Sequence, residues 1–393
     1  MNNKLDQNFA VDFTYPVFFT ENLFAVENTV LRELLDSHEN RTIKASFVID
    51  SGVAEANFSL ISDIKKYFAG LENQVALVEP ILVIEGGEGS KNDLKEFQKV
   101  LSLINDQGID RQSYVIAIGG GAILDMVGFA TSIAHRGVKH IRIPTTVLSQ
   151  NDSGIGVKNG INAFGKKNFL GAFNPPAAVI NDLTFLNTLS DRDWISGISE
   201  AIKVALIKDK SFFESLKADR ENLVNRDIEA MHALIFKCAK MHIEHIASKD
   251  PFEKGSSRPL DFGHWAAHKM EQMSDFSVRH GEAVAIGIAL DVSYSLIQGM
   301  ITKPEWEEII NLIGGLGFKL YIPELENDQV LLEGLEEFRE HLGGRLTIML
   351  LEGIGKGVEV NEMDSQKILQ ARDMLKEAEN KRYNQLFEAR EDK

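Results

Sequence analysis

The sequence predicts an α/β protein that begins with a Rossmann-like parallel-sheet domain and continues into a mainly α-helical domain. Short runs rich in Val and Ile alternate with amphipathic segments as far as residue 182, which is typical of a parallel sheet covered by helices on both faces. Between residues 191 and 296, apolar residues recur at helical spacing and strand signals almost vanish. Because 393 residues exceed one small core, we expect two domains, residues 1–182 and 183–393.

The strands expected in the first domain are β-branched runs separated by segments of helical length. They comprise residues 45–50, 81–85, 114–118 and 140–144. In the second domain, residues 345–351 are expected as a strand or hairpin arm, and residues 364–393 as a charged helix.

The amino-acid composition argues against several classes of function. A net charge of −16 argues against a nucleic-acid partner, because such partners favour a basic face. A small anionic substrate remains open, since it needs only a local cluster of Lys and Arg. The single cysteine, Cys238, excludes an intramolecular disulfide and a multi-cysteine zinc site. The polar N-terminus and the lack of a long apolar run predict a cytoplasmic protein without a membrane partner.

A glycine run follows the expected strand at residues 114–118. Gly119, Gly120 and Gly121 would let backbone amides approach a pyrophosphate at the start of a helix. The run is not the GxGxxG fingerprint, so a tight turn without a ligand is the alternative. Asp50 ends another expected strand, and the loop of residues 86–91 follows a third. Acids and glycines at several strand ends favour a dinucleotide in the crevice.

Residues 258–284 hold three of the ten histidines in a mostly apolar segment. His264 and His268 are four residues apart and share one helix face, and His280 precedes an apolar helical run. Neutral imidazoles in a dry pocket suit zinc, which usually takes a further ligand, often a carboxylate. Glu200 is the best candidate for that ligand. The pattern predicts a divalent-metal site, with zinc, cobalt or another metal left open.

The segment of residues 144–171 is rich in glycine, asparagine and lysine and contains one acid, Asp152. Lysine ammonium groups and amide donors there would suit the phosphate of a phosphorylated polyol. A solvated loop is the alternative interpretation.

The order of these motifs resembles the sugar phosphate cyclases, a family typified by 3-dehydroquinate synthase. The match covers roughly residues 45–300, with a weaker extension to about 355. The motifs that carry it are Gly119–Gly121 with Asp125, Arg136-Gly, Pro144-Thr-Thr, Asp152 with Lys158, Gly165-Lys-Lys-Asn168, Glu200 with Lys203, Arg258 with His264, and His280-Gly-Glu.

The resemblance implies a role for each residue at a matching position. The metal ligands would be Glu200, His264 and His280. The catalytic residues would be Asp152, Lys158, Lys203 and His268. Substrate contacts are implied for Lys167, Asn168, Arg258, Asp261 and His341, together with Arg136, which would reach the active site of a second subunit in a homodimer. The NAD contacts would be Asp50, Glu88, Lys91, Gly119, Gly120, Gly121, Asp125, Thr145 and Thr146.

Four of these residues also have simpler interpretations. Glu200 and Lys203, three residues apart, would also suit a surface ion pair of little energetic consequence. His268 would also suit a hydrogen-bonded core position, and Arg136 an ordinary exposed one.

The activity implied by the resemblance is a phosphate-eliminating cyclisation with catalytic NAD. A substrate hydroxyl is oxidised, the neighbouring C–H loses its proton, phosphate is expelled, the hydride returns, and an intramolecular aldol step closes the carbocycle. The alternatives are a metal-dependent alcohol dehydrogenase resembling glycerol dehydrogenase and a cyclase-like scaffold without activity.

Several positions depart from 3-dehydroquinate synthase. Asp261 stands where that enzyme has an asparagine, a family lysine is missing near Glu244, and His341 lies where a lysine pair is expected. Because added carboxylates repel an acidic substrate, we expect a neutral polyol phosphate such as sedoheptulose 7-phosphate, as in 2-epi-5-epi-valiolone synthases. A true 3-dehydroquinate synthase is the alternative. The run from Trp265 to His268 is unusual even in that branch.

Overall fold

The computed structural model describes residues 4–35, 43–71, 75–247, 252, 259–275 and 277–391. They fall into two compact units, one made of Met1–Pro144 and Val157–Asp182, the other of Thr145–Gly156 and Leu183–Lys393. The stretch that carries Asp152 therefore belongs with the helical C-terminal part of the chain.

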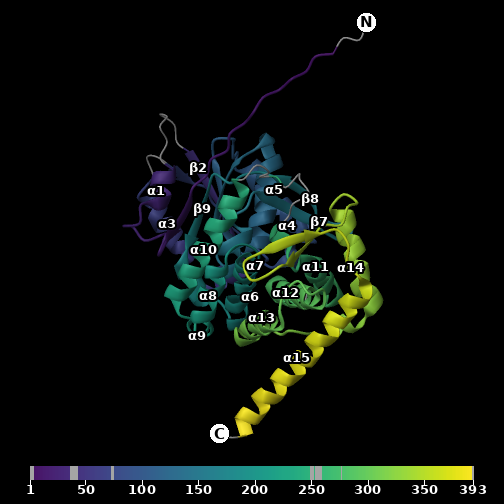
Figure 1. The fold of residues 1–393 in the computed structure, drawn as a ribbon. Helices are drawn as coiled ribbons and strands as arrows, with labels where there is room; N and C mark the ends of the chain where they lie inside the picture. Colours follow the sequence, from purple (N-terminus) through teal and green to yellow (C-terminus); the bar gives the residue numbers. More distant parts are fainter. Residues whose placement is uncertain are drawn as a thin grey trace. The chain divides into compact units, whose positions relative to one another are not determined.

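The first unit is built on a parallel sheet, as the sequence predicted (Figure 1). Its strands run in the order β1-β9-β6-β5-β2-β3, with β4 also paired to β2, and each of these pairs is parallel. The strands are β1 (Val17–Thr20), β2 (Ile43–Asp50), β3 (Val75–Leu77), β4 (Leu82–Ile84), β5 (Tyr114–Gly119), β6 (Lys139–Pro144) and β9 (Ala178–Asp182).

The helices of this unit lie between its strands in the chain. They are α1 (Val30–Leu35), α2 (Ser51–Ala56), α3 (Leu60–Ala69), α4 (Leu94–Asp106) and α5 (Gly121–Ile133), with short 3-10 turns at Glu88–Lys91 and Ala134–Arg136. Apolar side chains of α4 and α5 pack with those of β2 and β5 into one buried core. The central strand β5 is buried along its whole length, which explains its continuous apolar sequence.

Residues 158–173 form an antiparallel hairpin of β7 (Lys158–Ala163) and β8 (Lys166–Phe173). The interpretation of this segment as a solvated loop was wrong. The sequence signal was weak because glycine, asparagine and lysine are depleted in strands, and β8 is largely exposed.

The second unit is mainly helical. Its helices are α6 (Asp191–Ser196), α7 (Ile198–Lys208), α8 (Lys210–Ala218), α9 (Arg220–Val224), α10 (Ile228–Ile246), α11 (His264–Met273), α12 (His280–Ile297), α13 (Lys303–Gly315), α14 (Asp328–His341) and α15 (Ser365–Glu391). Shorter turns lie at Ser149–Ser153, Leu183–Thr188, Pro259–Asp261 and Pro323–Glu326. The late strand expected from the sequence is β10 (Ile348–Leu351), which pairs with β11 (Gly357–Val360).

Helix α12 is the centre of this unit. It packs against α7, α11, α13 and α15, and nearly all its side chains from Ala283 to Ser295 are buried. A helix that is apolar on all sides is stable only when other elements surround it, so α12 fixes its neighbours, among them the helices that carry the expected metal ligands.

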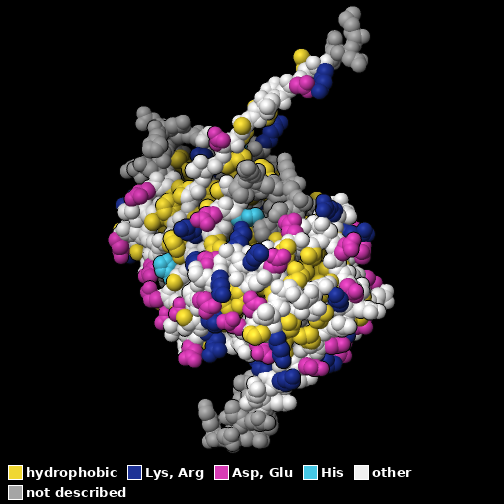
Figure 2. Space-filling view, in the orientation of Figure 1, with side chains coloured by type: hydrophobic (Ala, Val, Ile, Leu, Met, Phe, Trp, Pro, Cys, Tyr) yellow, Lys and Arg dark blue, Asp and Glu magenta, His cyan; other side chains and the backbone are white. Residues whose placement is uncertain are grey.

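None of the described helices is long and apolar enough to cross a membrane. Acidic and basic side chains are interspersed over the face seen in Figure 2.

Candidate active site

Three helices of the second unit bring the expected metal ligands together. Glu200 lies in α7, while His264 and His280 are the first residues of α11 and α12. The Nε2 atoms of His264 and His280 lie 3.8 and 3.9 Å from the same oxygen, Oε1 of Glu200. An ion with bonds of about 2.1 Å in tetrahedral geometry separates its ligands by about 3.4 Å, so both histidine–carboxylate distances are within roughly half an ångström of that spacing. The three ligand atoms all lie within 4.8 Å of one another, as residues that share one ion would.

The carboxylate of Glu200 fits such an ion. Its side chain is fully buried, and Oε1 has no hydrogen-bond donor among the described residues. Burial raises the pKa of Glu200, and Lys203, whose ammonium group contacts Oε2, offsets only part of this effect. A buried carboxylate with an open oxygen is costly unless a cation pairs with it. The interpretation of Glu200 and Lys203 as an exposed surface pair is therefore wrong.

Lys203 is a permanent cation in this site. Burial alone would lower its pKa, but Glu200, Asp152 and Asp261 raise it above its usual value. Asp152 lies in the short π-helical turn Ser149–Ser153. Burial opposes its ionisation, yet Lys203 and His242 hold the pKa of Asp152 well below its usual range. The ammonium group of Lys203 thus interacts with three carboxylates, those of Glu200, Asp152 and Asp261.

The two histidines of the cluster both present Nε2 to Glu200. Nδ1 of His264 lies 3.1 Å from the carbonyl oxygen of Phe262, and Nδ1 of His280 lies 3.0 Å from Oε2 of Glu271. These oxygens accept the Nδ1 protons, which leaves the Nε2 lone pairs available. Burial, followed by Lys203, holds the pKa of His264 well below its usual value, so its imidazole is neutral, as a metal ligand must be.

His268 lies beside the cluster, with ring centroids 5.6 Å from His264 and 6.1 Å from His280. Its position one turn after His264 on α11 was expected from the spacing. The structure thus brings His268 together with the three expected ligands.

A close helix contact fixes the start of α11. Gly263 has a φ of +78°, and a Cβ added to Gly287 of α12 would lie only 2.0 Å from the carbonyl oxygen of Gly263. On the same side, the buried carboxylate of Asp291 accepts hydrogen bonds from the Gly263 amide (2.9 Å) and the Trp265 indole (2.8 Å). The unusual tryptophan of the sequence is thus one of two donors that attach α11 to α12.

One residue near Asp152 was not predicted. His242 of α10 places Nδ1 2.8 Å from Oδ1 of Asp152. Glu244, which the sequence suggested as a pocket residue, instead leaves its side chain 63% exposed and lies 3.9 Å from Lys240 on the same helix. The suggestion that Glu244 lies in the pocket was wrong. His242 and Glu244 are two residues apart on α10, and side chains with that spacing point to different faces of a helix.

The first unit gathers most of the residues expected to contact NAD. Asp50 ends β2 and caps α2 through the Gly52 amide at 2.9 Å. Burial raises its pKa. A Cβ at Gly86 would lie 2.2 Å from the Asp50 carboxylate, and one at Gly119 would lie 3.1 Å from its Cβ. These glycines permit close approach of three strand ends. Helix α5 begins at Gly121 without a side-chain cap, which is compatible with an anion at the helix start.

A polar network continues from this edge into the hairpin. The ammonium group of Lys91 lies 3.0 Å from Asp125 and also contacts Asn168. The amide of Asn168 donates to Asn162 at 2.8 Å, and Asn162 donates to Glu88 at 3.2 Å. Burial would lower the pKa of Lys91, but Asp125 and Glu88 raise it. Asn162 was not predicted as a site residue, because nothing in the sequence shows that the hairpin reaches the Glu88 loop.

The remaining expected residues are more dispersed. Lys158 is exposed at the start of β7 and Lys167 is half-buried in β8. Arg136 is exposed and has a φ of +63°. In the second unit Thr145 is buried, and the Thr146 hydroxyl lies 2.8 Å from that of Ser149.

The structure does not describe the side chains of two residues that were expected to contact the substrate. Arg258 lies outside the described residues, and for His341 only the backbone at the end of α14 is described.

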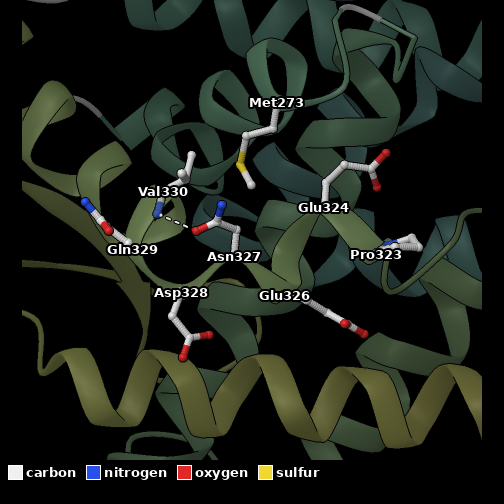
Figure 3. A pocket seen from close by; sticks show the side chains of 8 residues that line it. All are labelled: Met273, Pro323, Glu324, Glu326, Asn327, Asp328, Gln329 and Val330. Carbon is white, nitrogen blue, oxygen red and sulfur yellow. Dashed lines mark hydrogen bonds between the residues drawn. The ribbon is translucent and has the colours of Figure 1, made fainter.

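A surface pocket of about 890 Å³ lies at the other end of α11 (Figure 3). It is lined by Met273, Pro323, Glu324, Glu326, Asn327, Asp328, Gln329 and Val330. Met273 is nine residues beyond His264, which is about 14 Å along a helix. The acids Glu326 and Asp328 of this pocket pair with Lys376 and Arg372 of α15. The pocket is therefore separate from the cluster of Glu200, His264 and His280.

Comparison with known proteins identifies the family. The profile of the 3-dehydroquinate synthase N-terminal domain matches residues 81–196, and that of the C-terminal domain matches residues 197–335. The 3-dehydroquinate synthase of Thermodesulfovibrio yellowstonii is 32% identical over 293 residues, which are 74% of this chain and 81% of that protein. That of Xanthomonas campestris pv. campestris strain 8004 is 34% identical over 295 residues, 74% of this chain and 79% of that protein.

Solved structures agree in fold. ValA, a 2-epi-5-epi-valiolone synthase from Streptomyces hygroscopicus subsp. jinggangensis 5008 with NAD+ and Zn2+ bound, has a TM-score of 0.86 and 27% identity, covering 95% of this chain and 100% of that one. A 2-deoxy-scyllo-inosose synthase complexed with carbaglucose-6-phosphate, NAD+ and Co2+ has a TM-score of 0.75 and 23% identity, covering 92% and 96%.

These comparisons define the class as ring-forming lyases that eliminate phosphate from a sugar phosphate. The chain belongs to the 3-dehydroquinate synthase family. The family resemblance and the fold class expected from the sequence are confirmed.

Proposed function

We propose that this protein is an NAD- and metal-dependent sugar phosphate cyclase that acts on a neutral seven-carbon sugar phosphate, such as sedoheptulose 7-phosphate. The observation that carries the proposal is the convergence of the His264 and His280 Nε2 atoms on one open oxygen of Glu200, beside Lys203. An imidazole–imidazole–carboxylate set is a donor set typical of catalytic zinc.

The charges around Lys203 support a substrate without a carboxylate. Asp152 and Asp261 both act on Lys203 electrostatically, and Glu200 would be occupied by the metal. A carboxylate on the substrate would add a negative charge beside Asp152 and Asp261, which already interact with Lys203. Like charges disfavour binding. The similarity to ValA points in the same direction.

A bound divalent metal supplies Lewis acidity at a substrate hydroxyl, and a bound NAD supplies reversible hydride storage. Glu200, His264 and His280 would hold the metal. The residues proposed to contact NAD are Asp50, Glu88, Lys91, Gly119, Gly120, Gly121, Asp125, Thr145 and Thr146.

The other side chains would bind and orient the sugar. Lys203, kept charged by its neighbours, would stabilise negative charge that develops on substrate oxygens. Asp152 would accept hydrogen bonds from substrate hydroxyls, and His268 would move a proton beside the cluster. Lys158, Lys167, Asn168 and Arg258 would bind the phosphate, while Asp261 and His341 would contact the polyol.

The test is a phosphate-release assay. The purified protein, with NAD and Zn2+ or Co2+, is given sedoheptulose 7-phosphate or the corresponding carboxylate-bearing seven-carbon acid phosphate. We expect phosphate and a carbocycle from the neutral sugar. His264→Ala should abolish release, and His232→Ala, which changes a histidine of α10 outside the cluster, should not.

Other outcomes identify the alternatives. Faster turnover of the acid would make the protein a true 3-dehydroquinate synthase. Net NADH from a simple alcohol without phosphate would indicate an alcohol dehydrogenase, whose fold this chain shares at 14% identity with a probable glycerol dehydrogenase from Sinorhizobium meliloti 1021 (TM-score 0.56, covering 94% and 99%). Binding without turnover would indicate a scaffold.

We also propose a homodimer in which Arg136 reaches the partner's active site. The exposed position of Arg136 is compatible with this role. Light scattering should give twice the chain mass of 43.8 kDa, and Arg136→Ala mixed with His264→Ala should restore activity if sites are shared.

A further inference from the structure

We infer that Glu271 is a positioning residue that aims Nε2 of His280 at the proposed metal and is not itself a ligand. The inference rests on the proposed function for the presence of a metal. It concerns a side chain that the family resemblance did not assign.

The geometry of the contact supports this role. Glu271 is the eighth residue of α11, only 3% of its surface is exposed, and its Oε2 lies 3.0 Å from Nδ1 of His280. A carboxylate only accepts hydrogen bonds, so Nδ1 carries the proton, and in the neutral imidazole that binds a metal the lone pair is then on Nε2. That nitrogen is the one that faces Glu200, at 3.9 Å.

The second histidine of the cluster is oriented in the same way by a different group. Nδ1 of His264 faces the Phe262 carbonyl at 3.1 Å, and its Nε2 lies 3.8 Å from the same Glu200 oxygen. Two independent acceptors therefore select the same tautomer and direct both lone pairs to one point. An imidazole whose Nδ1 proton is accepted by a carboxylate donates its Nε2 electron pair to a metal more strongly than one hydrogen-bonded to a carbonyl. Loss of Glu271 should therefore weaken metal binding.

One alternative must be separated from this role. His268, Glu271 and His280 also present ligand atoms within 4.8 Å of one another, so an ion held by these three would make Glu271 a direct ligand. Two observations favour the Glu200 cluster. Oε1 of Glu200 is buried and open, whereas Oε2 of Glu271 is already at hydrogen-bond distance from Nδ1. The two arrangements predict opposite effects for changes at Glu200 and His268.

The experiment measures metal affinity without substrate. Metal-free protein is titrated with Co2+, followed by visible absorption, and with Zn2+ in competition with a chelating dye. Glu271→Gln keeps an acceptor without charge, and Glu271→Leu keeps the volume without an acceptor. We expect affinity to fall about 10- to 100-fold in the leucine variant and less in the glutamine variant, with the Co2+ spectrum still that of the wild-type ligand set.

Glu337→Gln is the matched control, because Glu337 pairs with Lys269 of the same helix at 2.6 Å but has a half-exposed side chain. It should bind Co2+ as the wild type does. His268→Ala should also retain affinity, and Glu200→Gln should lose most of it. Thermal unfolding of each metal-free variant shows whether affinity changes without a change in stability.

The inference is overturned by any of three results. Wild-type affinity in Glu271→Leu removes the positioning role. Loss of binding in Glu271→Gln and His268→Ala, with binding kept in Glu200→Gln, makes Glu271 a ligand. A parallel loss of thermal stability and affinity across the Glu271 variants makes its role merely structural. Phosphate release is measured separately, so graded Co2+ binding in a protein without cyclase activity would refute the proposed function and leave this inference intact.

Discussion

Asp291 should make the stability of the protein fall between mildly acidic and neutral pH. This carboxyl group of α12 is completely buried and accepts hydrogen bonds from Gly263 and Trp265. Burial raises its pKa from 3.8 to about 7, and the two hydrogen bonds only partly oppose that effect. The substitution Asp291→Asn removes the titration and keeps one acceptor.

The magnitude follows from linkage between ionisation and folding. Below pH 3.8 the acid is protonated in both states and contributes no pH dependence. Between pH 3.8 and about 7 the unfolded chain ionises while the folded chain does not, so the free energy of unfolding falls by about 1.4 kcal/mol per pH unit. The full difference is about 4 kcal/mol, and above pH 7 the penalty is constant. From pH 5 to pH 7 the loss should be about 3 kcal/mol.

The assay compares wild type and Asp291→Asn by thermal unfolding at half-unit steps from pH 5 to pH 8. The difference in melting temperature should change steadily up to pH 7 and then level, with the variant gaining relative to the wild type. Asp106→Asn, which changes an exposed acid at the end of α4, should follow the wild-type profile. Parallel profiles for wild type and Asp291→Asn would show that Asp291 ionises normally, which would refute the argument from its burial.

Three further predictions concern the same helices. Gly287→Ala should destabilise the protein by about 1–3 kcal/mol or more, because its Cβ would lie 2.0 Å from the Gly263 oxygen; Gly89→Ala, with no atom within 4 Å of the new Cβ, should melt as the wild type does. Lys203→Met should cost about 3–5 kcal/mol, since it leaves buried Glu200 without its cation, whereas exposed Lys66→Met should change the melting temperature little; equal effects would contradict the buried ion pair. Zn2+ at about 100 times its Kd should stabilise the wild type by about 2.7 kcal/mol, and a chelator should reverse this; an equal shift in Glu200→Gln would place the ion elsewhere.

The central strands and most helices were predictable because their signals are local. β2, β5 and β6 are buried β-branched runs, and α12 is a continuous apolar helix. The short strands β1 and β9 were missed, because four or five residues carry little periodicity. Their pairing at the sheet edge joins residues remote in the chain, such as Val17 and Val179.

The candidate site likewise combines features that are local in the sequence with contacts between elements that are remote in it. The spacing of His264 and His268 is local, so their common helix face was predictable. The contacts of His242 with Asp152, of Glu271 with His280 and of Asp291 with Trp265 join different helices, or a helix and a turn. A helix sequence shows which residues share a face and does not show what that face meets. For that reason the sequence drew attention to Glu244, near a missing family lysine, and not to His242, which contacts Asp152.

The fold class, the family and the kinds of side chain available for metal and phosphate chemistry follow from the amino-acid sequence alone, since they depend on motif order and local periodicity. The packed structure was needed to show that residues 145–156 belong with the helical unit and that one Glu200 oxygen faces both histidines. It was also needed to show that Glu271 contacts His280 and that Asp291 contacts Gly263. Those relations depend on distances between elements remote in sequence, and such distances arise only when the helices pack around α12.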